Sequence, residues 1–327
     1  MSSRIQIQGS PVYLHGANYP WTINNGKDNY GLDFGANTFG THSGVTTNRA
    51  QVEADFTLME DLGFNTLRWF VFTDGRGGIR YDDNGVPVSV SEKFFDDFEC
   101  ALAIASRNKI RIIFVLTDFL WLRGSRAEMM MSAEGRQALL ENIFAPLFER
   151  YSGNDVVLAW DVMNEPDWII NEMSAGANEK TMPLEEFKSF VKSVADAVHA
   201  SSRQLVTVGN ARLASVNVWD DDELHLDFLQ VHSYNDMLRN PWDEILFGRN
   251  FTDLALKRPL VIGEFSTSAH LAFESKSSVE ISLHEYLDFC RDSGYAGALY
   301  WSFNAVDKCG RESVDQLLRW KERITLT

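Results

Sequence analysis

Two glutamates stand where apolar runs of the chain end, and their type and setting suit acid–base chemistry on a glycosidic bond. Glu165 lies in the motif Asn164-Glu165-Pro166, directly after a largely apolar stretch that ends at Met163. Glu264 follows a second apolar run in the same way, 99 positions further along. Facing carboxyl groups cleave such a bond when one protonates the leaving oxygen and the other attacks the anomeric carbon. The fold must therefore bring two distant strand ends together.

Eight short runs typical of β-strands recur along the chain, most of them followed by a helical stretch. They cover residues 12–18, 64–70, 110–116, 156–163, 205–209, 228–232, 260–265 and 298–303. Several consist almost entirely of Val, Ile, Leu and Phe, as in parallel strands that are buried on both faces. Apolar stripes at helical spacing lie between them, for example Val52, Phe56, Met59 and Leu62. This alternation predicts an α/β fold of the (β/α)8 barrel type, although the helices after the fifth and sixth strands are indistinct.

The connections between the predicted elements differ in length. Helix-to-strand links such as Leu62-Gly63-Phe64 are tight, whereas strand-to-helix loops are long, as over 19–48 and 166–183. Long loops at the C-terminal ends of barrel strands are where active sites are built. No repeat, low-complexity segment or linker interrupts the chain, so we expect residues 1–327 to form one domain.

With these motifs in place, the chain resembles the clan A glycoside hydrolases and, within them, glycoside hydrolase family 5, which contains cellulases and β-mannanases. The resemblance is carried by Asn164-Glu165-Pro166 at the end of the fourth strand and Gly263-Glu264-Phe265 at the end of the seventh. Arg68 on the second strand, His232-Ser233-Tyr234 at the sixth and Trp301 on the eighth match the family pattern as well.

The resemblance implies a retaining β-glycoside hydrolase in which Glu264 is the nucleophile and Glu165 is the acid/base. Arg68 is expected to favour the ionised form of Glu264, and Tyr234 to donate a hydrogen bond to the same carboxylate. Glu165 is expected to be protonated before reaction. Retention requires the two carboxyl groups to lie about 5–5.5 Å apart. Asp161, inside the fourth strand, is expected to be structural and paired with an interior arginine.

Further residues at the predicted barrel mouth are candidates for contacts with sugar. Asn164 is expected to hold the sugar 2-hydroxyl, and His232 either tunes Glu165 or contacts sugar itself. Many family 5 enzymes carry a histidine at the end of the third strand, where this chain has Asp118; a sugar contact and a loop cap are both open for it. Aromatic rings in this region can stack on sugar, and the candidates are Trp21, Trp121, Trp168 and Trp301.

The expected partner is a neutral β-linked oligo- or polysaccharide of glucose or mannose. The resemblance alone favours β-1,4-mannan or β-1,4-glucan, and endo and exo action are both open. Two other functions fit the same residues. A non-catalytic carbohydrate-binding barrel would keep the cleft without turnover, and a transglycosylase would use the same two carboxylates with a sugar acceptor in place of water. An aldolase would need a lysine in a strand interior, and no predicted strand interior carries one.

The composition argues against several other classes of protein. Among 327 residues, 30 Lys and Arg face 46 Asp and Glu, a formal charge of −16 that disfavours nucleic acid and anionic membranes as partners. No apolar run approaches a membrane span, and the first residues lack a signal-peptide core, so we expect an intracellular protein or one whose leader has been removed. Three cysteines imply no disulfide framework. Motifs for zinc and phosphate binding are missing, so no metal or cofactor is expected.

Overall fold

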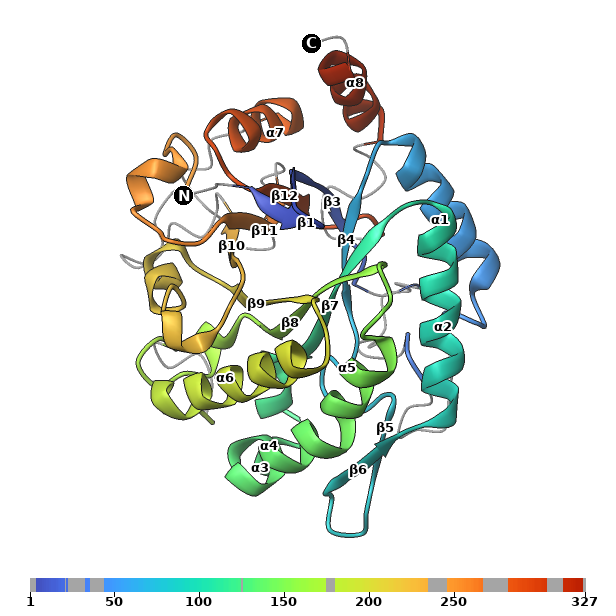
Figure 1. Ribbon diagram of the computed structural model, residues 1–327, viewed down its shortest axis with the longest axis vertical. Helices are drawn as coiled ribbons and strands as arrows, with labels where there is room; N and C mark the ends of the chain where they lie inside the picture. Colours follow the sequence, from blue (N-terminus) through green and yellow to red (C-terminus); the bar gives the residue numbers. More distant parts are fainter. Residues whose placement is uncertain are drawn as a thin grey trace.

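Eight parallel strands close into a barrel in the order β10–β11–β12–β3–β4–β7–β8–β9 (Figure 1). The computed structural model describes residues 4–20, 22, 33–35, 44–124, 126–174, 180–234, 246–266, 282–304 and 314–325. The barrel strands are β3 (Leu14–Asn18), β4 (Thr66–Phe70), β7 (Arg111–Asp118), β8 (Val157–Asn164), β9 (Leu205–Asn210), β10 (Leu229–Tyr234), β11 (Leu260–Ser266) and β12 (Gly297–Tyr300). Each of them coincides with one of the eight predicted runs, and the predicted (β/α)8 barrel is confirmed.

Helices surround this ring of strands (Figure 1). They are α1 (Arg49–Asp61), α2 (Glu92–Arg107), α3 (Ala127–Met131), α4 (Ala133–Leu139), the π-helical η2 (Leu140–Phe144), α5 (Ala145–Tyr151), α6 (Leu184–Ser201), α7 (Leu283–Asp292) and α8 (Val314–Thr325). After β9 and β10 the described chain forms only 3₁₀ turns: η4 (Leu213–Val218), η5 (Asp222–Leu224) and η6 (Phe251–Leu254). The indistinct helical signal after the fifth and sixth strands therefore corresponds to short turns.

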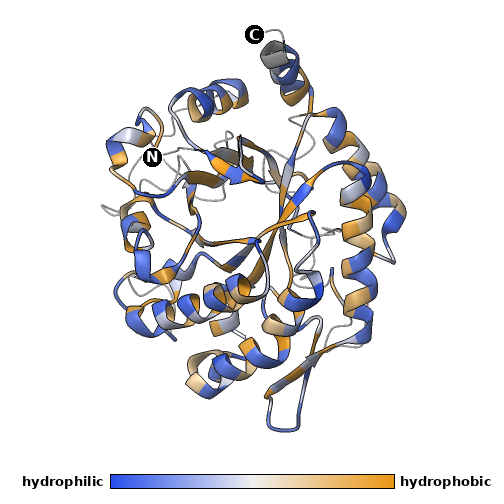
Figure 2. Ribbon diagram, in the orientation of Figure 1, coloured by the Kyte–Doolittle hydropathy of each residue, from blue (hydrophilic) through white to orange (hydrophobic). Residues whose placement is uncertain are grey.

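The helices pack on the barrel through the apolar stripes that the sequence predicted. Val52, Phe56 and Met59 of α1 are fully buried, and the helices carry hydrophobic and hydrophilic residues side by side (Figure 2). Gly63 follows α1 with φ at +78°, in the left-handed region that favours glycine. This residue lets the chain leave the helix and enter β4 three residues later.

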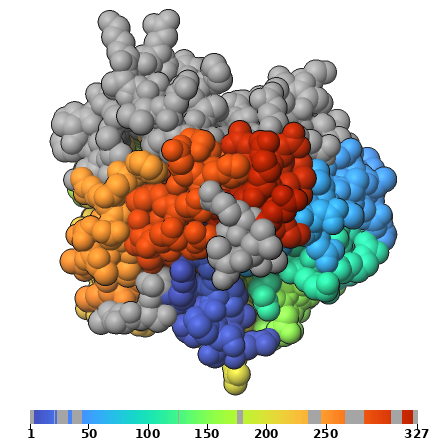
Figure 3. Space-filling view, turned by 90° about the horizontal axis from the view of Figure 1, so that it is seen from above, coloured from blue at the N-terminus to red at the C-terminus, as the bar shows by residue number. Residues whose placement is uncertain are grey.

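Apolar side chains fill the barrel interior toward the starts of the strands. The cluster consists of Ile5, Leu14, Ile113, Leu158, Ala159, Phe228, Val261, Ala296 and Leu299. Ile5 comes from a hairpin of β1 (Ile5–Ile7) and β2 (Ser10–Val12) that covers this end of the barrel. Figure 3 shows the hairpin in dark blue at one end of the molecule, next to α7 and α8. With this end plugged, buried polar side chains concentrate toward the other end, where the strands finish.

A second hairpin lies in the long connection between β4 and α2. Its strands β5 (Ile79–Tyr81) and β6 (Pro87–Val90) pair antiparallel outside the barrel (Figure 1). Val86 and Val88 are exposed on this hairpin. Among the described residues, no helix has both the length and the apolar character needed to span a membrane.

Candidate active site

The carboxyl ends of the barrel strands bring the predicted site residues together. Asp118 pairs with Asn164 across β7 and β8, and His232 pairs with Glu264 across β10 and β11. Glu165 follows β8 directly, with its backbone in the left-handed conformation at φ 49°. Because parallel strands of a barrel all finish at the same rim, residues far apart in sequence become neighbours there.

Arg68 on β4 lies at the centre of the polar cluster and is fully buried. Its Nη1 atom donates to Oε1 of Glu264 at 2.7 Å and to Oδ1 of Asn18 at 3.0 Å. Its Nη2 atom donates to Oδ1 of Asn164 at 2.8 Å, and its Nε atom donates to Oδ2 of Asp161 at 2.9 Å. A guanidinium offers five N–H donors in one plane, and here it fixes the position of four side chains at once.

Asp161 is held from several sides inside the barrel. Besides Arg68, the backbone N–H of Gly209 donates to its Oδ1 at 2.8 Å and Nε2 of Gln230 donates to its Oδ2 at 2.9 Å. A buried carboxylate is tolerated only when it is paired and hydrogen-bonded in this way. The predicted pairing of Asp161 with an interior arginine is confirmed.

Glu264 is bound on both of its carboxyl oxygens. Arg68 donates to Oε1, and the Tyr234 hydroxyl donates to Oε2 at 2.6 Å. Burial raises the pKa of Glu264, and although the charges on His232 and Arg68 oppose this effect, the net direction is upward. The Glu264 side chain is 5% exposed.

Glu165 is bound by two ring nitrogens. Nδ1 of His232 lies 2.8 Å from its Oε1, and Nε1 of Trp168 donates to its Oε2 at 2.7 Å. Burial raises the pKa of Glu165, but the hydrogen bond and charge of His232 and the hydrogen bond of Trp168 outweigh it, so the pKa lies below its usual value. His232 thus contacts the carboxyl directly.

The pKa values of the two carboxyl groups are shifted in opposite directions. The sequence predicts a Glu165 that is protonated before reaction and an Arg68 that favours the ionised form of Glu264. The pKa of Glu165 is lowered and that of Glu264 is raised, while the charge of Arg68 acts to lower the pKa of Glu264, as predicted. The lowering at Glu165 comes from the ring nitrogens of His232 and Trp168, a contact that the sequence motifs do not specify, and protonation of Glu165 before reaction stays a prediction.

The two carboxyl groups lie close together. One carboxyl oxygen of Glu165, one carboxyl oxygen of Glu264 and one ring nitrogen of His232 lie within 4.8 Å of one another. These three groups are close enough to hold a metal ion. All four carboxyl oxygens, however, already have hydrogen-bonding partners in His232, Trp168, Arg68 and Tyr234. The cluster is therefore built to hold two carboxyl groups near each other by protein donors.

Asn164 and Asp118 form the next layer of the cluster. Nδ2 of Asn164 donates to Oδ2 of Asp118 at 2.7 Å, and the backbone N–H of Leu120 donates to Oδ1 of Asp118 at 2.8 Å. Asp118 therefore caps the 3₁₀ turn η1 (Phe119–Leu122), one of its two expected roles. Burial raises the pKa of Asp118 to about 8, with further raising by the charges of Glu165 and Glu264.

The predicted aromatic platforms take different positions. Trp168 contacts Glu165 and has the guanidinium of Arg212 over its ring, 4.4 Å from the ring centroid. Trp301 is partly exposed and meets Phe70 edge to face at 6.1 Å. Trp121 is fully buried in the core, and its N–H donates to the carbonyl of Phe72 at 2.9 Å, so its ring is not available to sugar. Trp21 lies outside the described residues.

Asn18, at the end of β3, is a site residue that the sequence reasoning missed. It accepts a hydrogen bond from Arg68 and donates from Nδ2 to the carbonyl of Gly263 at 2.8 Å, the residue before Glu264. It is fully buried. The sequence signal that could have identified Asn18 is its position as a polar residue at the end of an apolar run, which Asn164 and Glu264 share.

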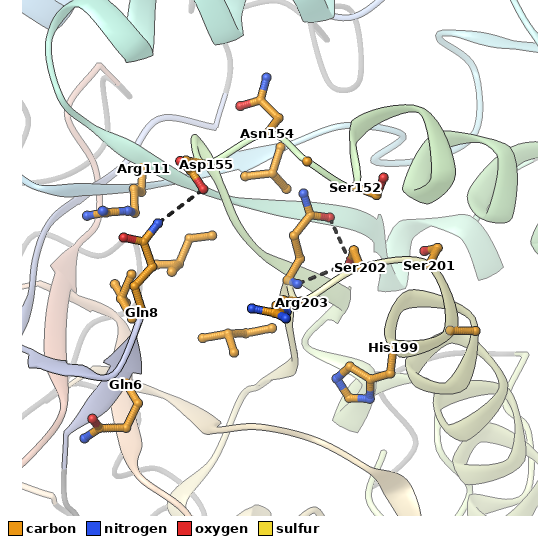
Figure 4. Close-up of a pocket in the computed structure, with 17 residues that line it drawn as sticks. Gln6, Gln8, Arg111, Ser152, Asn154, Asp155, His199, Ser201, Ser202 and Arg203 are labelled. Carbon is orange, nitrogen blue, oxygen red and sulfur yellow. Dashed lines mark hydrogen bonds between the residues drawn. The ribbon is translucent and has the colours of Figure 1, made fainter.

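A cavity of about 660 Å³ lies at the opposite end of the barrel, where β7, β8 and β9 begin (Figure 4). Arg111 and Arg203 line it, and Asp155, which accepts a hydrogen bond from Gln8 at 3.4 Å, is the one acid among its described lining residues. With one acid among its described lining residues, this cavity does not provide the two carboxyl groups that glycosidic bond cleavage needs. The mouth with Glu165 and Glu264 is the candidate active site.

Comparisons with known proteins agree with this architecture. The sequence model of the cellulase family, glycosyl hydrolase family 5, matches residues 27–307. A mannan endo-1,4-beta-mannosidase of Mytilus edulis is 24% identical, over 92% of this chain and 86% of the relative. One of Cryptopygus antarcticus is 23% identical, over 96% and 86%. The solved structure of a beta-1,4-mannanase from Aplysia kurodai superimposes with a TM-score of 0.79 at 21% identity, covering 99% of this chain and 95% of that one.

Proposed function

The chain belongs to the cellulase family, glycosyl hydrolase family 5, and from this premise we propose that it is a retaining endo-β-1,4-mannanase. That it is a glycoside hydrolase follows from the family. The preference for mannan rests on the relatives, which are named mannan endo-1,4-beta-mannosidases. The single-domain organisation is part of the proposal, and the pairing of β12 with β3 supports it, because late and early parts of the chain build one sheet.

The short separation between the two carboxyl groups carries the proposed mechanism. Atoms of Glu165 and Glu264 lie within 4.8 Å of each other. Inverting enzymes keep their carboxyl groups about 6.5–9.5 Å apart to admit a water molecule, whereas retaining enzymes keep them about 5–5.5 Å apart. The geometry therefore supports direct attack on the sugar by one of the two.

Glu264 is the nucleophile in this proposal. Its carboxylate attacks the anomeric carbon and forms a glycosyl ester, while the bond to the leaving sugar oxygen breaks. Arg68 and Tyr234 hold its two oxygens and so orient the attack. Arg68 also supplies a permanent positive charge that stabilises the anionic form.

Glu165 is the acid/base, and its proton reaches the leaving oxygen in the same step. Its side chain is 12% exposed. A bound sugar chain covers this surface, and burial is the factor that raises the pKa of Glu165. Substrate binding therefore shifts the group toward its protonated form. In the second step the Glu165 carboxylate takes a proton from water, whose oxygen attacks the anomeric carbon and releases Glu264.

Digestion of β-1,4-mannan, β-1,4-glucan and xylan by the purified protein tests the proposal. Mannan is expected to be cleaved best, with viscosity falling before much reducing sugar appears, because endo cleavage shortens chains from within. Proton NMR of the first products should show the β-anomer before mutarotation. An initial α-anomer would contradict retention, and release of mannose alone would contradict endo action. If the protein binds sugar but turns over no glycan, it is a non-catalytic carbohydrate-binding barrel.

A further inference from the structure

The amide of Asn164 is held at both of its ends. Arg68 donates to its Oδ1 at 2.8 Å, and its Nδ2 donates to Asp118 at 2.7 Å. A guanidinium has donors alone, so the oxygen of the amide must face Arg68. The acceptor oxygen of Asp118 then fixes the nitrogen on the other side. One N–H of Asn164 is left without a partner among the described residues.

Asp118 is itself rigidly placed. Its backbone N–H donates to the carbonyl of Thr73 at 3.0 Å, and its Oδ1 accepts from the N–H of Leu120 at 2.8 Å. Its neighbour across the β7–β8 pairing is Asn164. Within the described part of the chain it forms no ion pair with a cation, although it is only 4% exposed. A carboxyl group that is buried without a cation lowers the stability of the fold. We therefore expect Asp118 to have another role.

The chemical identity of Asp118 suits this double contact. Two N–H groups, from Leu120 and Asn164, converge on it, and a carboxyl group offers an acceptor oxygen to each of them. An asparagine would offer one oxygen and would turn an N–H toward the other donor. A histidine at this position has no pair of oxygens to offer.

We infer that Asp118 is a positioning residue for the proposed reaction, which holds the Asn164 amide so that its remaining N–H faces the 2-hydroxyl of the sugar at Glu165 and Glu264. The inference rests on the proposed function. Hydrogen bonds to the 2-hydroxyl strengthen in the transition state of glycoside cleavage. An amide that is free to rotate would present its oxygen or its nitrogen to this hydroxyl and would lose part of that stabilisation.

The surrounding charges are compatible with this role. Arg68 on β4, His232 on β10 and the acids Asp161, Glu165 and Glu264 lie around the cluster, and the charges of Glu165 and Glu264 raise the pKa of Asp118. Burial raises the pKa of Asp118 to about 8, while the hydrogen bonds from Leu120 and Asn164 act to lower it, because both donors favour a carboxyl oxygen that accepts.

The test compares two substrates in wild type, Asp118→Ala and Asp118→Asn. The substrates are 2,4-dinitrophenyl β-mannobioside and its analogue that lacks the 2-hydroxyl on the sugar bonded to the aryl group. Both variants are expected to lose about tenfold to a hundredfold in kcat/KM on the hydroxyl substrate, the scale of one or two hydrogen bonds. On the 2-deoxy analogue, which cannot use the contact, the loss should stay below about threefold.

Asp167→Asn is the matched control. Asp167 is also buried beside Glu165, but its carboxyl accepts from the backbone of Ala211 and the hydroxyl of Ser215 and does not contact Asn164. It should change both substrates by the same factor. An equal loss on both substrates in the Asp118 variants, or no loss, overturns the inference. If wild type cleaves neither substrate, the proposed function fails instead, so the two failures are distinguishable. Asp118→Asn preserves volume and keeps the test valid if Asp118→Ala does not fold.

Discussion

His232 lies between the two glutamates, with its Nδ1 atom 2.8 Å from Oε1 of Glu165 and 3.6 Å from Oε2 of Glu264. The shorter contact lowers the pKa of Glu165 against the effect of burial. One imidazole thus sets how readily the proposed acid/base keeps its proton.

Replacing His232 by Ala should therefore move the alkaline limb of the pH profile of kcat/KM to higher pH. The acid must be protonated to act, and loss of the histidine raises the pKa of Glu165. His232→Asn keeps an N–H near the position of Nδ1 and should move the limb less. His199→Ala, which removes an exposed partner of Asp227 far from the mouth, should leave the profile unchanged. A limb that stays in place or moves down would show that His232 does not control this proton.

The roles of the two glutamates predict different azide products. On a 2,4-dinitrophenyl glycoside, whose leaving group needs no proton, Glu165→Ala should still form the glycosyl ester and then accumulate it. Azide should rescue turnover and give the β-glycosyl azide, because it attacks from the face that water uses. Glu264→Ala should lose about a thousandfold or more in kcat/KM, and azide should give the α-glycosyl azide. NMR of the products decides, and exchanged products would reverse the assignment.

Arg68 should matter for stability as well as for activity. Its guanidinium binds four buried side chains, two of them acids. Arg68→Ala leaves Asp161 and Glu264 buried without their cation and should lower the free energy of unfolding by about 3–5 kcal/mol. Arg49→Ala, which breaks an exposed pair with Glu53, should cost less than about 1 kcal/mol. Urea titrations measure both, and similar values would mean that the buried cluster adds little to stability.

Trp168 and Trp121 should respond differently to substitution by Phe. Trp168→Phe removes the N–H that contacts Glu165 and should move the alkaline limb of the pH profile upward, with KM nearly unchanged. Trp121→Phe removes a buried hydrogen bond and part of a core ring and should lower the free energy of unfolding by about 1–3 kcal/mol. The Trp121 variant should keep the wild-type pH profile and KM. A raised KM with unchanged stability in that variant would restore Trp121 as a sugar contact.

Two buried carboxyl groups predict that stability falls as pH rises from about 4 to about 8. Burial raises the pKa of Asp33 to about 7 and that of Asp118 to about 8, above the values of an unfolded chain. Between these limits the folded state binds more protons than the unfolded state, so raising the pH favours unfolding. Each group contributes at most about 1.4 kcal/mol per pH unit. Asp118→Asn should make the decline shallower between pH 4 and pH 8, as urea titrations at several pH values measure, and an unchanged slope would argue against a raised pKa.

Most of the fold was predictable because it depends on local pattern. A strand buried on both faces needs a continuous apolar run, and eight such runs match the eight barrel strands. The positions of Glu165 and Glu264 at strand ends then place both at one rim, whatever the details of the loops. The hydrogen bonds of Arg68 were only partly predictable: Asp161 and Glu264 were expected, whereas Asn18 and Asn164 are brought to it by the closure of the barrel.

Two tryptophans show what the sequence could not predict. Trp121 and Trp168 each stand three residues after an acid at the end of a barrel strand, Asp118 and Glu165, and each lies in a short 3₁₀ turn. The sequence assigns both the same role. In the folded chain the N–H of Trp121 turns into the core toward Phe72, while that of Trp168 turns to Glu165. The sequence by itself determined the barrel and the two carboxyl groups, because apolar runs and strand ends are local. Tertiary structure alone decided which ring reaches them, because a side chain's direction depends on what the neighbouring strands place around it.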